Sequence, residues 1–169
     1  TGRDAALATR ITFGVLQNRF LIDWYLAQFC RRPLERLEPA VRAALRAGGY
    51  QLLFLDKVPA RAAVDESVKL TRALCRNPAA AGMVNGILRN LDRARGTLTP
   101  PDTLSVRTSH PQWLVDVFTG RLGEDGARAL LEADNREPPM AAQVNLCRGT
   151  VAQAASALEQ EGVEVTPHP

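Results

Sequence analysis

The chain has 169 residues, 46% of them hydrophobic, with 12 Gly, 11 Pro and a formal net charge of +3; this excludes a fibrous or disordered chain and allows one medium domain, or one domain and part of another, with a proper core. No apolar run approaches the roughly 20 residues of a membrane helix, and the N-terminus has no signal-peptide pattern, so we expect a soluble, cytoplasmic protein without a membrane partner. The three cysteines, Cys30, Cys75 and Cys147, are widely spaced among mostly apolar residues, which argues against a disulfide framework or a metal site.

The positive charge belongs to the first part of the chain. Residues 1–95 carry 16 Lys and Arg, 14 of them Arg, against 8 Asp and Glu, whereas residues 96–169 carry 5 against 10. Arginine has a planar guanidinium that suits phosphate oxygens and stacks on bases, so an RNA partner is one interpretation. The other is a GC-rich genome, which favours Ala, Arg, Gly and Leu without any binding role.

Residues 4–30 are predicted to form one long helix that is apolar on more than one side and therefore largely buried. Asn18 falls on its apolar face, so we expect it to make an internal hydrogen bond. Arg31-Arg32-Pro33 ends the helix, and Pro39 is well placed as the first residue of the next one. The helical period is carried by Leu7, Ile11, Val15, Ile22, Leu26 and Phe29.

Residues 41–95 are predicted to form three consecutive helices, because their apolar residues recur at steps of three and four. Pro59 and Pro78 punctuate the two junctions, since proline cannot donate an amide and restricts the residue before it. The pair Gly48-Gly49 costs helix propensity, which indicates that another helix passes too close for a β-carbon. Asn85 lies one position off the apolar stripe, so we expect it to bond to a neighbouring helix.

Basic side chains follow the exposed faces of the second and third of these helices. One interpretation is a solvated face, with an ion pair between Asp65 and Lys69 four residues apart. The other is contact with RNA phosphates, because arginines gather near two helix C-termini. The predicted RNA-binding residues are Arg72, Arg76, Arg89 and Arg93, followed by Lys69, Arg10 and Arg3.

Residues 96–103, GTLTPPDT, read as a linker between domains. After it, Ser109-His110-Pro111 suits the start of a helix. Residues 130–135 are predicted to end the next helix, which Glu137-Pro138-Pro139 breaks. No second catalytic residue lies near His110 in the sequence, so we do not expect a general base there. The predicted buried side of the helix that begins at Pro111 consists of Trp113, Leu114, Val117 and Phe118.

The last part of the chain has the pattern strand, helix, strand. Residues 141–147 alternate enough for a strand, residues 151–160 are helical until Gly162, and residues 163–165 read as a second strand. This spacing predicts the start of a βαβ unit.

Two blocks of the sequence carry a resemblance to a known family. LRAGGYQLLFLDKVPARAAVDESVKLTR (residues 45–72) and GMVNGILRNL (residues 82–91) resemble the NusB-like domain at the amino end of the RsmB, Fmu or Sun family of ribosomal RNA cytosine-C5 methyltransferases. The shared pattern is Gly-x-Tyr-Gln-Leu-Leu, Asp-Lys-Val-Pro, Ala-x-x-Glu-Ser-Val and Val-Asn-Gly-x-Leu-Arg. The segment after the linker, with Ser-His-Pro-x-Trp-Leu at residues 109–114, is similar to the connecting region of these enzymes and has no counterpart in the free-standing antitermination factor NusB.

The resemblance implies a mainly α protein. It implies an antiparallel, RNA-binding NusB-like helical bundle over residues 1–95, the linker at 96–103, a helical connector over 104–139 and the start of a small α/β (βαβ) subdomain over 140–169. The first one or two helices of the family's bundle have no counterpart here, so an exposed apolar groove or an exchange of helices between copies is expected.

The resemblance also implies a function, with residues 1–169 as the RNA-binding and positioning part of a small-subunit rRNA methyltransferase. The implied partners are that ribosomal RNA and the protein's own C-terminal methyltransferase domain, which in the family binds S-adenosyl-L-methionine and supplies two catalytic cysteines. None of Cys30, Cys75 and Cys147 has their sequence context, so we expect this stretch to be inactive alone, with no catalytic, cofactor-binding or metal-binding residue. The alternatives are a stand-alone NusB-like antitermination module that binds RNA and protein, and a helical protein-protein scaffold with a solvated basic face.

Overall fold

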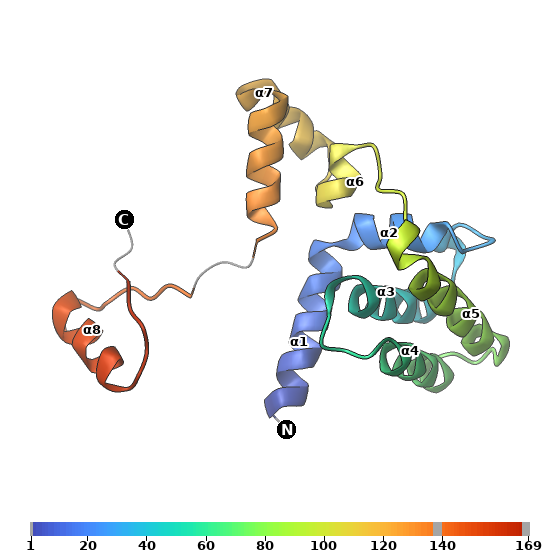
Figure 1. Cartoon of the computed structure of the whole chain (residues 1–169), viewed down its shortest axis with the longest axis horizontal. Helices are drawn as coiled ribbons and strands as arrows, with labels where there is room; N and C mark the ends of the chain where they lie inside the picture. Colours follow the sequence, from blue (N-terminus) through green and yellow to red (C-terminus); the bar gives the residue numbers. More distant parts are fainter. Residues whose placement is uncertain (1, 137–139, 167–169) are drawn as a thin grey trace. The chain divides into compact units, whose positions relative to one another are not determined.

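The computed structural model describes residues 2–136 and 140–166, and the chain divides into two compact units, unit 1 (Thr1–Asn135) and unit 2 (Arg136–Pro169) (Figure 1). The regular secondary structure of these described residues is helical, as the resemblance implies for the main fold class. None of the helices in them combines the length and the apolar content that a membrane crossing requires. Unit 1 contains α1 (Gly2–Gln17), α2 (Arg19–Ala27), α3 (Pro39–Phe54), α4 (Ala60–Leu74), α5 (Ala79–Ala94), α6 (Leu104–Thr108), α7 (Gln112–Asp134) and the short 3-10 helices η1 (Leu34–Arg36) and η2 (Arg95–Thr97), and unit 2 contains α8 (Val151–Gln160).

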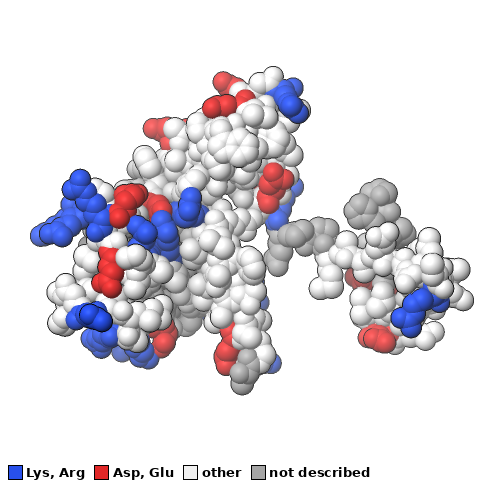
Figure 2. Space-filling view, turned by 180° about the vertical axis from the view of Figure 1, so that it is seen from behind, with Lys and Arg blue, Asp and Glu red and all other residues white. Residues whose placement is uncertain are grey.

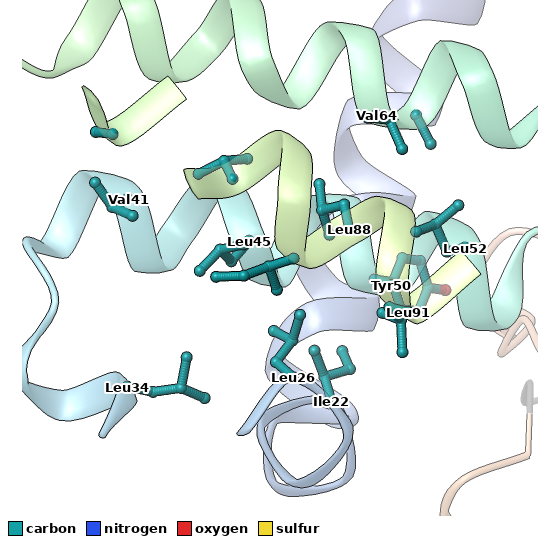
Figure 3. Close-up of a cluster of buried hydrophobic side chains, with 14 of the residues drawn as sticks. Ile22, Leu26, Leu34, Val41, Leu45, Tyr50, Leu52, Val64, Leu88 and Leu91 are labelled. Carbon is teal, nitrogen blue, oxygen red and sulfur yellow. The ribbon is translucent and has the colours of Figure 1, made fainter. Parts of the chain in front are cut away.

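The core of unit 1 lies where α3, α4 and α5 pack on one another and α2 packs on α3. The predicted helix boundaries are confirmed here: α3 begins at Pro39, and Pro59 and Pro78 directly precede α4 and α5. Because each proline ends one helix and leaves the next free to turn back, three short helices form a packed layer instead of one long rod. Figure 3 shows side chains of the four helices directed toward one another, among them Ile22, Leu26, Leu45, Leu52, Val64, Leu88 and Leu91.

The close helix contact predicted at Gly48-Gly49 is confirmed. A β-carbon on Gly48 would lie 2.5 Å from Leu88 Cδ1 of α5 and 2.6 Å from Ser67 Oγ of α4, and one on Gly49 would lie 3.2 Å from Ile22 Cγ2 of α2. The two glycines thus let α3 approach three helices at once, which compensates for the cost of glycine in a helix.

The predicted single helix over residues 4–30 is wrong, because the chain breaks into α1 and α2 at Asn18. This residue has φ −106° and ψ 21°, and its side-chain Nδ2 donates to the carbonyl of Gly14 at 3.0 Å, the same carbonyl that accepts its backbone N–H. The internal hydrogen bond expected of Asn18 is therefore confirmed. A short amide that bonds to its own backbone favours leaving the helix, and the break turns α2 so that Ile22 and Leu26 become fully buried.

Helix α1 is also more exposed than its sequence predicts. Phe13 keeps 66% of its surface exposed, Leu16 63% and Leu7 42%. The contact of α1 with α3 is formed at Gly14, where the ring of Tyr50 occupies the space of a side chain. The expected burial of this segment is confirmed only for α2, because a helix that contacts one neighbour buries one stripe.

A bidentate ion pair ties α2 to α3. Arg46 Nε donates to Asp23 Oδ1 at 2.8 Å and Arg46 Nη2 to Asp23 Oδ2 at 2.6 Å, with both side chains only about 20% exposed. Planar, paired hydrogen bonds of this kind are stronger than those of exposed ion pairs, which usually contribute little.

Replacing Asp23 by Asn should therefore lower the free energy of unfolding by about 1 kcal/mol, because one of the two hydrogen bonds is lost, the other is no longer charge-assisted, and Arg46 keeps an unpaired charge. The matched control is Glu66→Gln, which removes an ion pair of the same 2.6 Å length whose side chains are both 67% exposed; we expect a change below about 0.5 kcal/mol. Urea unfolding of the two variants measures the difference, and equal losses would contradict it.

The segment at residues 99–109 contacts α2, and α7 packs on α6. Trp24 Nε1 donates to the carbonyl of Thr99 at 3.4 Å, and the N–H of Leu21 donates to Ser109 Oγ at 3.1 Å. Ser109 adopts a left-handed conformation with φ 57°, which separates α6 from α7. The predicted linker at 96–103 and the other domain boundaries stay predictions.

Helix α7 begins next to Pro111, as expected, and has a sharp break at Gly123, where φ 72° and ψ 173° suit only glycine. The predicted buried side is partly wrong: Trp113 is 65% and Val117 42% exposed, whereas Val115 is buried. Leu114 and Phe118 are half-buried. The predicted stop at Glu137-Pro138-Pro139 lies outside the described residues.

Unit 2 confirms the predicted helix at residues 151–160. Its start is a capping box in which the N–H of Gln153 donates to Thr150 Oγ1 at 3.3 Å and the N–H of Thr150 donates to Gln153 Oε1 at 2.9 Å. Gly162, with φ 82°, ends it as expected.

The two predicted strands are wrong for the described residues, since 140–166 contain no strand. In place of the first predicted strand, the chain turns at Asn145. Its Oδ1 accepts a hydrogen bond from the N–H of Cys147 at 3.0 Å, and its carbonyl accepts one from the N–H of Arg148 at 2.9 Å. Residues 163–166 have no regular secondary structure. Alternating residues produce a strand only when another strand pairs with them.

Candidate nucleic-acid interface

The α4–α5 hairpin carries most of the side chains predicted to contact RNA. Residues 75–78 connect the two helices, and so short a connection makes them antiparallel neighbours. At the turn, Asn77 Oδ1 accepts the N–H of Ala79 at 3.0 Å, which satisfies one free amide at the start of α5. Figure 2 shows Lys and Arg side chains gathered over the part of unit 1 that α3–α5 form, with acidic side chains between them.

A hollow of about 310 Å³ lies between the two helices of the hairpin. Lys69 and Arg72 of α4 line one wall, and Asn85 of α5 lines the other. Among the described residues Arg72 has no hydrogen-bond or ion-pair partner, and its side chain is exposed. Asp65 also lines the hollow, so its walls present both signs of charge.

The ion pair expected between Asp65 and Lys69 is wrong. Lys69 Nζ donates to Glu66 Oε1 at 2.6 Å, and Asp65 lies 3.7 Å from Arg61. The hydrogen bond to Glu66, with the charge of that carboxylate, raises the pKa of Lys69, so its amine stays charged. Lys69 is thus partly neutralised by a neighbour, whereas Arg72 is not.

Arg89 and Arg93 are exposed and are held against α5 by hydrogen bonds. Arg89 Nε donates to Asn85 Oδ1 at 2.8 Å, and Arg93 donates to the carbonyl of Arg89 at 3.3 Å and to Asn90 Oδ1 at 2.7 Å. Asn85 therefore bonds within its own helix, and the expected bond to a neighbouring helix is wrong. Each guanidinium keeps most of its five N–H donors for a ligand.

The four main candidates do not form one cluster. Arg72 lies near the C-terminal end of α4 and Arg76 in the connection that follows, so both lie beside the start of α5 in this antiparallel hairpin, whereas Arg89 and Arg93 lie toward the other end. Asn85 connects the two pairs, because it lines the hollow beside Arg72 and accepts a bond from Arg89. The hairpin therefore presents a row of cations along its length.

Arg3 and Arg10 lie on α1, which packs mainly on α3. Both are exposed, but they stand on a different element from the hairpin. The structure thus brings Lys69, Arg72, Arg76, Arg89 and Arg93 onto one hairpin and leaves Arg3 and Arg10 apart from it.

Several arginines of the first 95 residues have structural partners. Arg46 is paired with Asp23, Arg42 Nη1 donates to the carbonyl of Glu35 at 3.3 Å, and Arg95 Nη1 donates to the carbonyl of Leu52 at 2.9 Å, at the end of α3. Arg95 also lies 2.7 Å from Asp92. Part of the positive charge therefore stabilises the bundle and is not available to a ligand.

No group of three or more His, Cys, Asp or Glu side chains within residues 2–136 and 140–166 is arranged to hold a metal ion. Partial burial, followed by the charge of Asp23, raises the pKa of Cys30. Partial burial, followed by the charge of Glu38, raises the pKa of Cys75. Both shifts disfavour the reactive thiolate. The Nδ1 of His110 is buried without a hydrogen-bond partner.

Sequence reasoning missed Arg31 and Arg32, which line a second hollow against α5. They were assigned only to the end of a helix. The available signal was a pair of cations directly after Phe29 and Cys30, in a loop with no carboxylate before Glu35.

Comparison with known proteins gives two family matches. Residues 1–93 match the NusB family, and residues 110–169 match the ferredoxin-like domain of the RsmF/B-like methyltransferases. Among curated relatives, the "Probable ribosomal RNA small subunit methyltransferase B" of Bacillus subtilis (strain 168) is 30% identical over 168 residues, which covers 96% of this chain and 37% of the relative. The "Ribosomal RNA small subunit methyltransferase B" of Salmonella paratyphi B (strain ATCC BAA-1250 / SPB7) is 33% identical, covering 99% of this chain and 38% of the relative. The chain thus spans less than two fifths of the length of these relatives.

Proposed function

Because this chain belongs to the NusB family through its residues 1–93, we propose that it is the part of a small-subunit ribosomal RNA methyltransferase that binds and positions the RNA. One observation carries this proposal: proteins named as methyltransferases of that RNA match 96–99% of the chain, through both units. In this proposal the chain works with the rest of the same enzyme as its partner.

The reaction of the complete enzyme is proposed to be methyl transfer from S-adenosyl-L-methionine to C5 of cytosine, on the basis of the sequence resemblance. The described residues do not fit that cofactor, since its usual site is a glycine-rich loop between a strand and a helix and residues 2–136 and 140–166 contain no strand. We therefore assign no step of methyl transfer to them. Mass spectrometry of 5-methylcytosine in small-subunit rRNA, with and without the complete gene, tests the assignment.

The arginines of the α4–α5 hairpin support RNA binding, because they are charged and have N–H donors free for a ligand. Arg72 and Arg76 are exposed and have no protein partner among the described residues, so their donors are available to phosphate oxygens. Arg89 and Arg93 are held in place by Asn85 and Asn90, which lowers the entropy lost when they bind. Contacts of this kind add affinity with little sequence information.

Neutralising either arginine pair should weaken RNA binding and its salt dependence. We expect Arg72→Gln with Arg76→Gln, and separately Arg89→Gln with Arg93→Gln, to reduce the slope of log affinity against log salt by about 1.4–1.8, or roughly 0.7–0.9 per lost phosphate contact. This corresponds to an affinity loss of roughly 20-fold or more at 0.1 M salt. Fluorescence anisotropy of a labelled small-subunit rRNA fragment over a range of salt measures both quantities.

The control variant is Arg121→Gln with Arg128→Gln, which removes the same charge from exposed positions of α7. Equal slopes for this control and for both hairpin variants would show that only net charge matters, and would reject the hairpin as the RNA site. A wild-type chain that does not bind RNA at low salt would reject the function itself and favour a protein-protein scaffold.

A stand-alone NusB-like antitermination module is a second candidate, favoured by the match at residues 1–93. The match of residues 110–169 to the methyltransferase ferredoxin-like domain counts against it. Loss of 5-methylcytosine from rRNA on deletion of the gene would reject this second candidate.

A further inference from the structure

A second hollow in unit 1, of about 430 Å³, lies between α5 and the segment that joins α2 to α3. This volume falls within the range of about 300–1,000 Å³ typical of small-ligand sites. It opens on a different face of α5 from the hollow of the hairpin, because Met83, Gly86 and Asn90 line it while Gly82 and Asn85 line the other.

The walls of this second hollow are apolar. Ile87 is only 6% exposed, and Phe29 and Leu37 are half-buried. Gly86 leaves the backbone of α5 uncovered, because a β-carbon there would have no atom within 4 Å. A flat ring therefore has room to lie on the helix surface between these side chains, where stacking and apolar contact would hold it.

The rim of the hollow is cationic and has one amide. Arg31 and Arg32 are exposed and have no partner among the described residues, and no carboxylate lines this hollow. Asn90 Oδ1 accepts a hydrogen bond from Arg93 at 2.7 Å, so the two Nδ2 hydrogens of Asn90 remain to donate to a ligand. Apolar walls, an amide donor and two guanidinium groups match a flat heterocycle that carries an anion.

The two hollows are connected through Arg93. The Arg93 guanidinium donates to Asn90 Oδ1, at the second hollow, and to the carbonyl of Arg89. The Arg89 side chain in turn donates to Asn85 Oδ1, in the hairpin hollow. A single strand that runs over α5 would therefore contact both hollows, whereas a free nucleotide would use only one.

We propose that the second hollow receives one unstacked base of the bound RNA, with Asn90 donating to an acceptor on the base edge and Arg31 and Arg32 contacting the adjacent phosphates. This inference rests on the RNA binding proposed above. Single-stranded RNA is usually recognised in this way, by splayed bases held on side chains beside a cationic path for the backbone.

Gly86→Leu tests the proposal, because leucine fills the hollow at an exposed helical position where it also raises helix propensity. With a single-stranded fragment of small-subunit rRNA we expect a loss of affinity of about 5-fold or more at 0.1 M salt and an unchanged salt slope, since a base contact releases no counterion. Gly120→Leu is the matched control, an exposed glycine of α7 that also has no atom near its would-be β-carbon, and it should bind like wild type.

A second readout uses the same RNA with 2-aminopurine at single-stranded positions. At one position the wild-type protein should change the fluorescence of that base, and Gly86→Leu should abolish the change. Wild-type binding with no effect of Gly86→Leu would overturn the base site alone, and a shallower salt slope would show that the variant acts through phosphate contacts and would also overturn it. Absence of RNA binding by the wild-type chain would overturn both this inference and the proposed function.

Discussion

Replacing Leu88 by alanine is expected to lower the free energy of unfolding of unit 1 by about 2–5 kcal/mol. Leu88 is fully buried at the centre of the layer formed by α3, α4 and α5, and its Cδ1 lies against Gly48 of α3. Truncation removes apolar contacts with several helices at once and leaves a cavity. The helices around it cannot collapse freely, because Gly48 and Ser67 already bring their backbones close together.

Urea unfolding followed by circular dichroism measures this loss, with Leu74→Ala as the control. Leu74 lies at the end of α4 and is 57% exposed, so its truncation should change the free energy of unfolding by no more than about 0.5 kcal/mol. A small effect at Leu88, comparable with that at Leu74, would mean that the α3–α4–α5 layer is not the cooperative core of the protein.

Replacing Gly14 by alanine is expected to cost about 2–3 kcal/mol, although alanine is the better helix former by up to about 1 kcal/mol. A β-carbon at this position would overlap the ring of Tyr50, at its Cζ, Cε2 and hydroxyl oxygen. The ring cannot move aside easily, since Tyr50 is 7% exposed and stacks on Phe54 with centroids 5.2 Å apart. Accommodation therefore requires α1 and α3 to separate.

Gly120→Ala separates packing from propensity, because Gly120 is an exposed helical glycine with no neighbour near its would-be β-carbon. Thermal or urea unfolding should show a gain of about 0.5–1 kcal/mol for this variant. Stabilisation by both substitutions would show that α1 does not pack on α3 at Gly14. Restoration of Gly14→Ala by a smaller residue at position 50 would confirm the steric cause.

The hairpin shows how far sequence patterns reach for the candidate site. Arg72, Arg76, Arg89 and Arg93 were predicted to be exposed from their positions opposite an apolar stripe, and they are exposed. Their division between the two ends of the hairpin follows from the antiparallel packing of α4 and α5. Whether they contact RNA stays a prediction.

The same limit explains which arginines the sequence could not distinguish. Arg46 pairs with Asp23, 23 residues earlier, and Arg95 donates to the carbonyl of Leu52, 43 residues earlier. Nothing in the residues beside Arg46 or Arg95 indicates that these two stabilise the bundle while Arg72 has no protein partner. Arg31 and Arg32 became candidates only because α5 lies opposite their loop.

The amino-acid sequence alone determined the elements whose causes are local. Prolines at 39, 59 and 78 set the starts of α3–α5, and Gly48 indicated a close helix contact. The capping box of Thr150 and Gln153 sets the start of α8, and Gly162 sets its end. The tertiary structure alone decided which face of α1 stays exposed, which arginines have protein partners, and that residues 140–145 and 163–166 form no strands. The physical reason is that helix starts and stops depend on neighbouring backbone groups, whereas burial, ion pairing and strand pairing depend on groups brought together from distant parts of the chain.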